Sequence, residues 1–352
     1  MLEPQRMQPV AAAERWDLPA IESVAALTEW LQLNPGELEW LADLKGVLRH
    51  ERPGKLVHYH YRLLTKATGE IRLIEAPKSR LKHIQRQILA RILDKIPAHS
   101  AAHGFVSGRS IRTFTAPHVG RRIVLKMDLR DFFPSLAAAR IEAFFRTAGY
   151  PELVADLLAG LCTNWSPRAL WPGPEFREAR DLYCRPHLPQ GAPTSPALAN
   201  LCFYRTDCRL AGLASSAGAV YTRYADDLAF SGDDEFARGV ERFAAHVAVI
   251  VREEGFAVNH RKTRVMRQGV RQQLAGLVLN DRPNVKRAEL DRLKATLTNC
   301  VRSGPEGQNR ERHPQFRAHL EGRVNFVETV NSARGKQVRT IFDRIRWASG
   351  DK

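Results

Sequence analysis

Residues 220–230 read Val-Tyr-Thr-Arg-Tyr-Ala-Asp-Asp-Leu-Ala-Phe, two short segments on either side of a tight turn that carries Asp226 and Asp227. Their β-favouring residues predict two strands, 220–224 and 228–230, joined as a hairpin. Adjacent carboxylates repel each other, so a hairpin that presents them favours a bound cation. A pair of Mg²⁺ ions bridged by carboxylates is a common arrangement for phosphoryl transfer. The alternative is an ordinary solvated turn.

A third carboxylate follows another apolar segment. Residues 123–133 read Ile-Val-Leu-Lys-Met-Asp-Leu-Arg-Asp-Phe-Phe, and the predicted strand delivers Asp128 at its end. Two carboxylates from a hairpin and one from a neighbouring strand would clamp two Mg²⁺ ions, for which Mn²⁺ is a possible substitute. One ion would activate an attacking 3′-hydroxyl, and the other would steady a triphosphate and its leaving pyrophosphate.

A proline-rich segment stands between these two acidic segments. Residues 188–200 read Leu-Pro-Gln-Gly-Ala-Pro-Thr-Ser-Pro-Ala-Leu-Ala-Asn. Gly191 allows a backbone to approach a nucleotide closely, and the prolines stiffen the start of a helix. A plain proline-rich loop is the alternative, but it does not account for the order of all three segments.

The remaining pattern predicts a strand–helix core followed by a helical module, of the α/β or α+β class. Residues 18–50 are expected to be helical, interrupted at Asn34-Pro35-Gly36, and 57–64 with 71–75 to form a hairpin through Thr68-Gly69. The other expected elements are helices at 81–96, 136–148, 153–161, 195–214 and 236–254, a proline- and arginine-rich connection at 166–187, a strand pair within 256–280, and a mostly helical tail from 287.

Charge indicates a polyanionic partner. The 352 residues contain 54 Lys and Arg against 38 Asp and Glu, a net charge of +16. Residues 261–346 hold 20 Lys and Arg against 8 Asp and Glu, which is 12 of the 16 excess charges. A basic helical module that follows a phosphate backbone fits this distribution, with Arg317 and Arg323 as candidate contacts. The alternative is a merely basic surface.

No segment has the length of apolar sequence that spans a membrane, and no secretory signal stands at the start, so no membrane partner is expected. The five cysteines form no CxxC pair, which argues against zinc and favours reduced thiols in the cytoplasm.

In its motifs and their order, the chain resembles the bacterial retron-type reverse transcriptases from about residue 16 to 347. The matching stretches include Arg-Leu-Ile-Glu-Ala-Pro-Lys at 72–78, His-Gly-Phe at 103–105 and Tyr-Ala-Asp-Asp at 224–227, with further matches at 81–85, 108–111, 128–135, 188–201 and 262–264. The resemblance implies an α+β right-hand fold. Its parts would be an N-terminal helical segment at 1–50, fingers at 51–122, an antiparallel palm sheet backed by helices at 123–280 with a fingers insertion at about 162–187, and a basic helical thumb at 281–352.

The resemblance also implies roles around the nucleotide. The catalytic residues would be Asp128, Asp226 and Asp227, and Leu129 would add its backbone carbonyl to the metal ligands. Arg72 would contact the triphosphate, with Lys78 and Arg80 as weaker candidates for the same role. The Phe133 ring would block a ribose 2′-hydroxyl. Gln190 and Gly191 would contact the nascent base pair or the template, and Lys262 would lie near the leaving pyrophosphate. Each of three residues has an alternative role: Arg72 could be a solvated strand arginine, Phe133 a core residue, and Lys262 a plain contact to the nucleic-acid backbone. Asp131 is expected to be structural.

Two stretches depart from the retron pattern. Residues 114–118 keep only His118 of the usual Asn-Ala-x-x-His, and Leu274-Ala275-Gly276 keeps only the glycine of Val-Thr-Gly. Both features are associated with binding the cognate RNA. His118 is either an RNA contact or a buried histidine with satisfied hydrogen bonds.

The leading hypothesis is an RNA-directed DNA polymerase that copies a bound structured RNA, serving as template and primer, into an RNA–DNA hybrid. Retron resemblance implies anti-phage defence beside an effector protein. The alternatives are a defence-associated relative that makes DNA without its own retron RNA or without a template, and a group II intron-like reverse transcriptase, for which no maturase extension is seen. An RNA-binding scaffold with an inactive polymerase fold is a further alternative, but the three aspartates argue against it.

Overall fold

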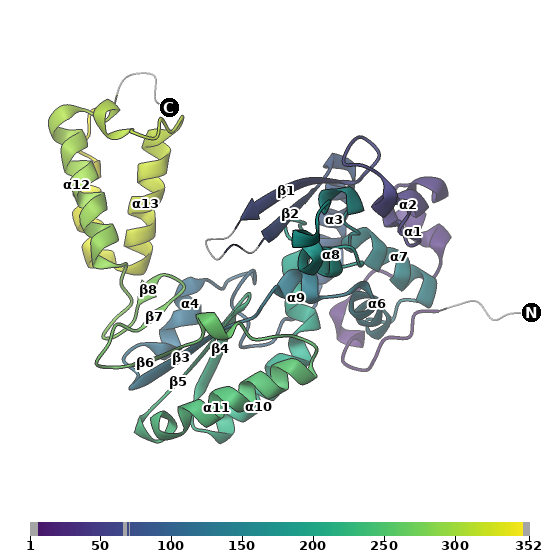
Figure 1. The fold of residues 1–352 in the computed structure, drawn as a ribbon, viewed down its shortest axis with the longest axis horizontal. Coiled ribbons are helices and arrows are strands. Elements are labelled where there is room, and N and C mark those ends of the chain that lie inside the picture. Colours follow the sequence, from purple (N-terminus) through teal and green to yellow (C-terminus); the bar gives the residue numbers. More distant parts are fainter. Residues whose placement is uncertain (1–5, 66–68, 70, 348–352) are drawn as a thin grey trace, which may run out of the picture.

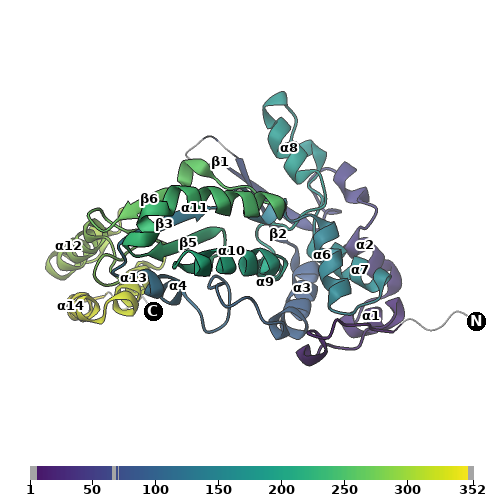
Figure 2. The same ribbon diagram turned by 90° about the horizontal axis from the view of Figure 1, so that it is seen from below.

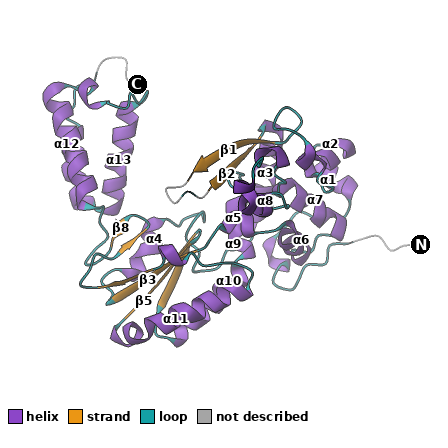
Figure 3. Ribbon diagram, in the orientation of Figure 1, coloured by secondary structure: helices purple, strands orange, loops and turns teal. Residues whose placement is uncertain are grey.

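A four-stranded antiparallel sheet forms the centre of the chain. The structure is a computed structural model that describes residues 6–65, 69 and 71–347. The strand order is β4-β5-β3-β6, and the strands are Ile123–Asp128 (β3), Val220–Tyr224 (β4), Asp227–Gly232 (β5) and Arg264–Arg267 (β6). Asp128 pairs directly with Asp227 in the β3–β5 register. The predicted hairpin and antiparallel palm sheet are confirmed (Figures 1 and 3).

The two faces of this sheet have different coverings. Helices α10 (Tyr204–Ser216) and α11 (Asp234–Glu253) pack along one face, as Figures 1 and 2 show. Helix α11 presents an apolar stripe to the sheet, made of Phe236, Val240, Phe243, Val247 and Val251. Because side chains alternate along a strand, Leu125 and Met127 enter this core while Val124 joins a second core on the opposite face. Asp128 therefore emerges on the face away from α11.

The fingers contain a second, two-stranded sheet. Strands β1 (Tyr59–Thr65) and β2 (Ile71–Pro77) pair antiparallel, as predicted, while Thr68 of the predicted turn lies outside the described residues. Helices pack together beside this hairpin: α1 (Val24–Leu31), α2 (Pro35–Ala42), α3 (Ser79–Arg91), α6 (Ala138–Thr147) and α7 (Glu152–Cys162). Asn34 caps α2 by accepting a hydrogen bond from the Glu37 amide at 2.8 Å, which explains the interruption expected at this turn.

Two predicted helices are shorter than expected. The segment 195–214 is not one helix but two, α9 (Ser195–Cys202) and α10, separated at Phe203. The turn there lets the buried Phe203 ring pack against Phe132 and Phe256, with ring centres 5.4 and 4.8 Å away. The helix predicted at 81–96 ends at Arg91 because Ile92 leaves the helical conformation, with φ −123° and ψ −65°.

The connection at 166–187 has structure of its own. It contains α8 (Arg177–Tyr183), and Trp171 and Tyr183 stack with ring centres 5.4 Å apart. Both pack with Leu73 of β2 in a small separate core. Two short helices remain, α4 (Ile111–Thr115) and α5 (Phe132–Ser135).

The described part of the chain also contains short 3₁₀ turns. They lie at Glu14–Trp16, Val47–His50, Leu93–Lys95, Ala116–His118, Arg168–Leu170, Pro174–Phe176, His260–Lys262 and Glu306–Gln308.

The C-terminal module is helical, as predicted. It consists of α12 (Arg287–Ser303), α13 (Phe316–Val330) and α14 (Ser332–Phe342). A small hairpin of β7 (Gln273–Leu274) and β8 (Leu277–Val278) precedes it, and Ala275 and Gly276 form the turn with φ 44° and 84°. The thumb helices share the second core with Val124 and Ala229 of the palm sheet. In the described part of the chain, no helix combines the length and apolar character that crossing a membrane requires.

A buried ion pair joins strand β2 to the connection at 166–187. The Glu75 carboxylate on β2 lies 2.8 Å from His187 Nε2, and both side chains have zero exposure. Asn164 donates a hydrogen bond to the other Glu75 oxygen at 2.8 Å. Burial by itself lowers the pKa of His187, but the charge and hydrogen bond of Glu75 and the Arg185 carbonyl outweigh burial and raise it. Glu75 therefore favours the protonated form of the buried His187 ring.

We predict that this pair makes stability depend on pH. The unperturbed histidine pKa is 6.5 and the folded value is higher, so the contribution is complete below 6.5 and is lost as pH rises through the folded value. Glu75→Gln should lower the free energy of unfolding by about 3–5 kcal/mol at acidic pH and by less at alkaline pH. Urea denaturation of both proteins at several pH values measures this, and a pH-independent difference would contradict it.

Candidate active site

The three predicted aspartates meet at one end of the palm sheet. Asp128 ends β3, Asp227 begins β5 opposite it, and Asp226 lies in the turn before β5. Backbone hydrogen bonds fix this end: the Leu129 amide donates to the Asp226 carbonyl at 2.9 Å, and the Asn259 amide donates to the Asp128 carbonyl at 2.7 Å. The carboxylates are thus carried by strands that are cross-linked through the main chain.

The turn that carries Asp226 is short and closely packed. Tyr224 pairs with Asp227, which leaves only Ala225 and Asp226 in the turn, and Ala225 has φ 53°. Gly104, from a distant loop, packs directly on it, because a Cβ at residue 104 would stand 2.7 Å from the Ala225 nitrogen. The turn is therefore held from outside the hairpin as well as within it.

Two lysines neutralise the carboxylates. Lys262 Nζ lies 3.0 and 3.1 Å from the two oxygens of Asp128, and Lys126 Nζ lies 2.8 Å from Asp227 Oδ1. Burial opposes the charge of Lys262, but the hydrogen bond and charge of Asp128 outweigh burial and raise its pKa. Burial, together with the charges of Asp128 and Asp227, raises the pKa of Asp226.

The donors fit a hard divalent cation in kind, since carboxylate and carbonyl oxygens are the ligands Mg²⁺ prefers. Burial, and after it the charges of Asp128 and Asp227, disfavour the ionised form of Asp226, and a cation beside it would offset both effects. Their arrangement is not yet that of a metal site: among the described residues, no three acidic, histidine or cysteine side chains are gathered closely enough to hold an ion. A cation at Asp128 would therefore have to displace the Lys262 amine.

A cavity of about 210 Å³ opens over Asp128 and Asp226. It brings together most of the residues predicted around the nucleotide, namely Arg72, Leu129, Phe133, Gln190 and Lys262. The Gln190 carbonyl accepts a hydrogen bond from the Glu75 amide at 2.9 Å, so β2 and the 188–190 loop form one wall. Phe105, Asn259 and Tyr183 also line the cavity and were not singled out from the sequence.

Two predicted contacts, Lys78 and Gly191, are placed differently. Lys78 does not line the cavity but donates to the carbonyls of Gly54 and Lys55 at 2.6 and 3.0 Å, because the chain before β1 folds over it. Gly191, with φ 132°, packs on β2, where a Cβ would lie 2.9 Å from the Glu75 carbonyl. The absence of a side chain at Gly191 therefore lets the loop pack against β2.

His118 is not available to RNA in this fold. Its side chain is buried, and its ring nitrogens lie 2.6 Å from Ser231 Oγ and 2.7 Å from Thr222 Oγ1. Burial and the charge of Arg121 lower its pKa to about 3, so the ring is neutral. The prediction of an RNA contact is corrected, and the buried alternative holds.

The candidate thumb contacts lie on α13. Arg317 stands 5.9 Å from the Trp347 ring centre, and Arg323 lines a groove of about 400 Å³ beside α12.

Sequence reasoning missed a buried ion pair behind the turn. Arg223 and Asp207 have zero side-chain exposure, and Arg223 Nη2 lies 2.7 Å from Asp207 Oδ2. Arg223 also donates to Asn200 Oδ1 at 2.9 Å and to the Ala225 carbonyl at 3.1 Å. Alternation along β4 turns Arg223 toward α10, the face opposite Asp128. An arginine in a strand of otherwise uncharged residues was the available signal.

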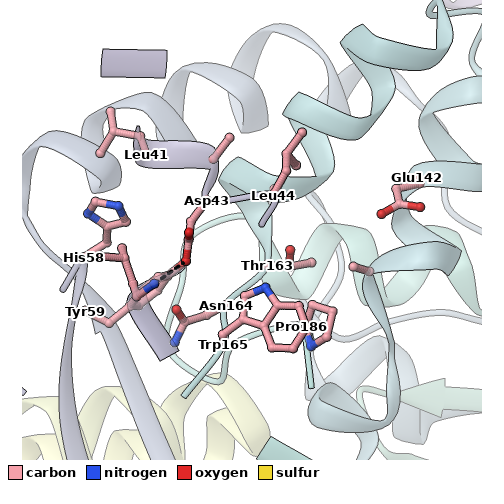
Figure 4. A pocket seen from close by; sticks show the side chains of 14 residues that line it. Leu41, Asp43, Leu44, His58, Tyr59, Glu142, Thr163, Asn164, Trp165 and Pro186 are labelled. Atoms are coloured by element: carbon pink, nitrogen blue, oxygen red, sulfur yellow. Dashed lines mark hydrogen bonds between the residues drawn. The ribbon is translucent and has the colours of Figure 1, made fainter. Parts of the chain in front are cut away.

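A second pocket, of about 60 Å³, lies between α2, α6 and the end of α7 (Figure 4). Its polar side chains are used by the fold. Asp43 accepts hydrogen bonds from the Val47 and Leu48 amides at 2.8 and 3.2 Å, and His58 Nε2 lies 2.7 Å from the Trp40 carbonyl. These hydrogen bonds stabilise the segment between α2 and β1, and the pocket does not include the three aspartates.

An antiparallel palm sheet with carboxylates on adjacent strand ends, beneath a cavity that holds an arginine and a lysine, defines a nucleotidyl-transferring polymerase of the right-hand class. The family described as reverse transcriptase (RNA-dependent DNA polymerase) matches residues 64–293. Retron Mx65 reverse transcriptase of Myxococcus xanthus is 45% identical over 83% of this chain and 67% of its own length. Retron Mx162 reverse transcriptase of the same organism is 36% identical over 91% of this chain and 66% of its own length.

Retron Ec86 reverse transcriptase of Escherichia coli is 30% identical over 80% of this chain and 78% of its own length. The chain thus spans about two thirds of the length of the two Myxococcus relatives. Among solved structures, telomerase of Candida tropicalis has a TM-score of 0.42 at 11% identity, covering 65% of this chain and 55% of that one. The chain belongs to the reverse transcriptase family, among the retron reverse transcriptases.

We predict that Arg223→Met disables the site although Arg223 does not line the cavity and its side chain bonds Asp207, Asn200 and the Ala225 carbonyl. It leaves Asp207 as an unpaired buried charge, which should lower the free energy of unfolding by about 3–5 kcal/mol. Displacement of the turn should lower the rate of nucleotide incorporation by about a hundredfold. Arg205→Met, at a largely exposed arginine on α10, the helix that carries Asp207, is the control and should change neither stability nor incorporation rate. Normal incorporation by folded Arg223→Met would refute the positioning role.

Proposed function

We propose that this protein is an RNA-directed DNA polymerase that copies a bound structured RNA into DNA by two-metal nucleotidyl transfer. The observation that carries the proposal is the meeting of Asp128, Asp226 and Asp227 at the ends of β3 and β5, in a chain of the reverse transcriptase family. Divalent ions held by these carboxylates and the Leu129 carbonyl would lower the pKa of the attacking 3′-hydroxyl and neutralise charge on the triphosphate.

The side chains of the cavity have separable tasks in this reaction. Arg72 lies on the fingers strand and would pair with triphosphate oxygens, which match a guanidinium fork. Lys262, whose raised pKa keeps it charged, would move from Asp128 toward the leaving pyrophosphate and stabilise its charge. Gln190 extends the same wall and would contact the nascent base pair.

The template and primer in this proposal are a structured non-coding RNA, and the product is an RNA–DNA hybrid. The relatives are named retron reverse transcriptases, which supports a retron role in anti-phage defence with an effector protein, in the cytoplasm. The basic thumb, including Arg323 and Arg317, would hold the duplex through its phosphates. Sequencing the RNA and DNA that copurify with the protein tests this: a DNA copy joined to one structured RNA supports it, and untemplated DNA favours the template-independent alternative.

We predict that Asp226→Asn and Asp227→Asn each abolish DNA synthesis with Mg²⁺ or Mn²⁺ while leaving RNA affinity within about twofold of wild type. Each change removes a negative charge from the site but keeps the shape of the side chain. Primer extension and filter binding measure the two properties. Near-normal extension by either variant would refute the metal assignment.

Phe133 gives a test of product chemistry. Its ring lines the cavity at the start of α5, where a bulky side chain would exclude a ribose 2′-hydroxyl. Phe133→Ala should raise incorporation of ribonucleotides relative to deoxynucleotides by at least about tenfold, the effect of one steric contact in a binding pocket. The buried neighbour Phe132 is the comparison position, and Phe132→Leu should leave the ratio unchanged. An unchanged ratio in folded Phe133→Ala would refute the steric role.

A further inference from the structure

Phe105 is an aromatic side chain that the fold leaves uncovered at the active site. Its side chain is 58% exposed, and it lines the catalytic cavity together with Asp128, Ala225 and Asp226. Its ring centre lies 6.2 Å from that of Tyr224. An exposed phenylalanine at the opening of a polar cavity contributes little to the stability of the protein itself.

The backbone of Phe105 is also in an unfavourable conformation. Its φ is 59°, a left-handed value that bulky residues adopt only where the surrounding structure enforces it. Such residues concentrate at functional sites, so the conformation motivates a search for a ligand.

The surrounding structure ties this residue to the catalytic turn. The His103 amide donates to the Arg223 carbonyl at 2.7 Å, and Asn200 donates to the Gly104 carbonyl at 2.8 Å. Gly104 packs on the Ala225 nitrogen so closely that a Cβ would lie 2.7 Å from it. The side chain next in sequence is therefore held in a set position relative to Asp226.

The cavity has two walls with different chemistry. Arg72, Phe133 and Gln190 come from the fingers side and suit the triphosphate, sugar and base of an incoming nucleotide. Phe105 belongs to the wall of the catalytic turn, where the 3′-hydroxyl to be extended must lie if the aspartates act on it. The apolar faces of a base and its sugar at that end match an exposed ring.

We propose that Phe105 stacks on the last base pair of the template–primer duplex and so positions the 3′-terminus on the catalytic turn. This inference rests on the proposed polymerase function, because it assigns the growing duplex, and not the incoming nucleotide, to this wall. Phe105 thereby contributes affinity for the duplex end without reading its sequence, since every base presents a flat face.

The test uses the full chain and an RNA template annealed to a DNA primer. Phe105→Ala should weaken equilibrium binding of this duplex by about tenfold, within the range that stacking on one base provides. KM for the incoming nucleotide should change by less than about twofold, which separates this wall from the Arg72 wall. Phe105→Trp should restore affinity and Phe105→Leu should not, because leucine is apolar but has no flat face. Leu153→Ala, at a similarly exposed apolar residue on α7, is the control and should bind normally.

A fluorescent base gives a readout that a purely structural role would not move. With 2-aminopurine in the terminal base pair, the wild type should quench the probe more than Phe105→Ala does, and a probe further back in the duplex should report no difference. Unchanged affinity and fluorescence in Phe105→Ala, or full affinity in Phe105→Leu, would overturn the inference.

Absence of DNA synthesis by the wild type would instead overturn the proposed function. Because duplex binding and fluorescence are measured without catalysis, they judge Phe105 separately in that case.

Discussion

The ion pair between Arg223 and Asp207 lies where the catalytic hairpin, helices α9 and α10 and the loop around Gly104 converge. Both side chains are excluded from water, so their attraction is strong and a missing partner is costly. The same guanidinium reaches the Ala225 carbonyl, and its own main-chain carbonyl receives the His103 amide. The two-residue turn before Asp227 is thus held by a hydrogen bond from a buried side chain on the other face of the sheet. Through Ala225, this support reaches the residues next to it, Asp226 in the chain and Gly104 in the packing.

The carboxylates of Asp128 and Asp227, on the face of the sheet that lines the cavity, are compensated in a different way. There the counter-charges, Lys262 and Lys126, are themselves partly accessible, and each is borne by a flexible side chain. Flexible cations can leave when a substrate or ion arrives, whereas the buried arginine cannot. The site therefore combines a fixed electrostatic support behind the sheet with an exchangeable one in front of it, which suits a reaction that must admit and release highly charged molecules.

Local sequence predicted those parts of the fold that short-range rules determine. The hairpin of β4 and β5 and the end of β3 at Asp128 follow from apolar strands and turn residues. The gathering of Arg72, Phe133, Gln190 and Lys262 over Asp128 was implied by the family resemblance and not by these rules. The rest depended on packing between distant segments. Phe203 interrupts a continuous helical pattern because its ring fits between Phe132 and Phe256. His118 can be buried because its ring nitrogens are hydrogen-bonded with Ser231 and Thr222, and Lys78 donates to carbonyls of a preceding loop. None of these partners lies near its residue in the sequence.

The second core joins the thumb to the strands of the palm. Val124 on β3 and Ala229 on β5 are buried in the same cluster as Leu293 and Val324 of the thumb helices, and Val124 precedes Asp128 on the same face of the strand. The functional border between palm and thumb is consequently not a place where the chain can be cut or a foreign module grafted without exposing apolar strand residues. A chimaera that exchanges thumbs between such polymerases has to carry over the matching residues of β3 and β5 with the helices. Evolution of a new thumb meets the same requirement, so thumb and palm are expected to change together.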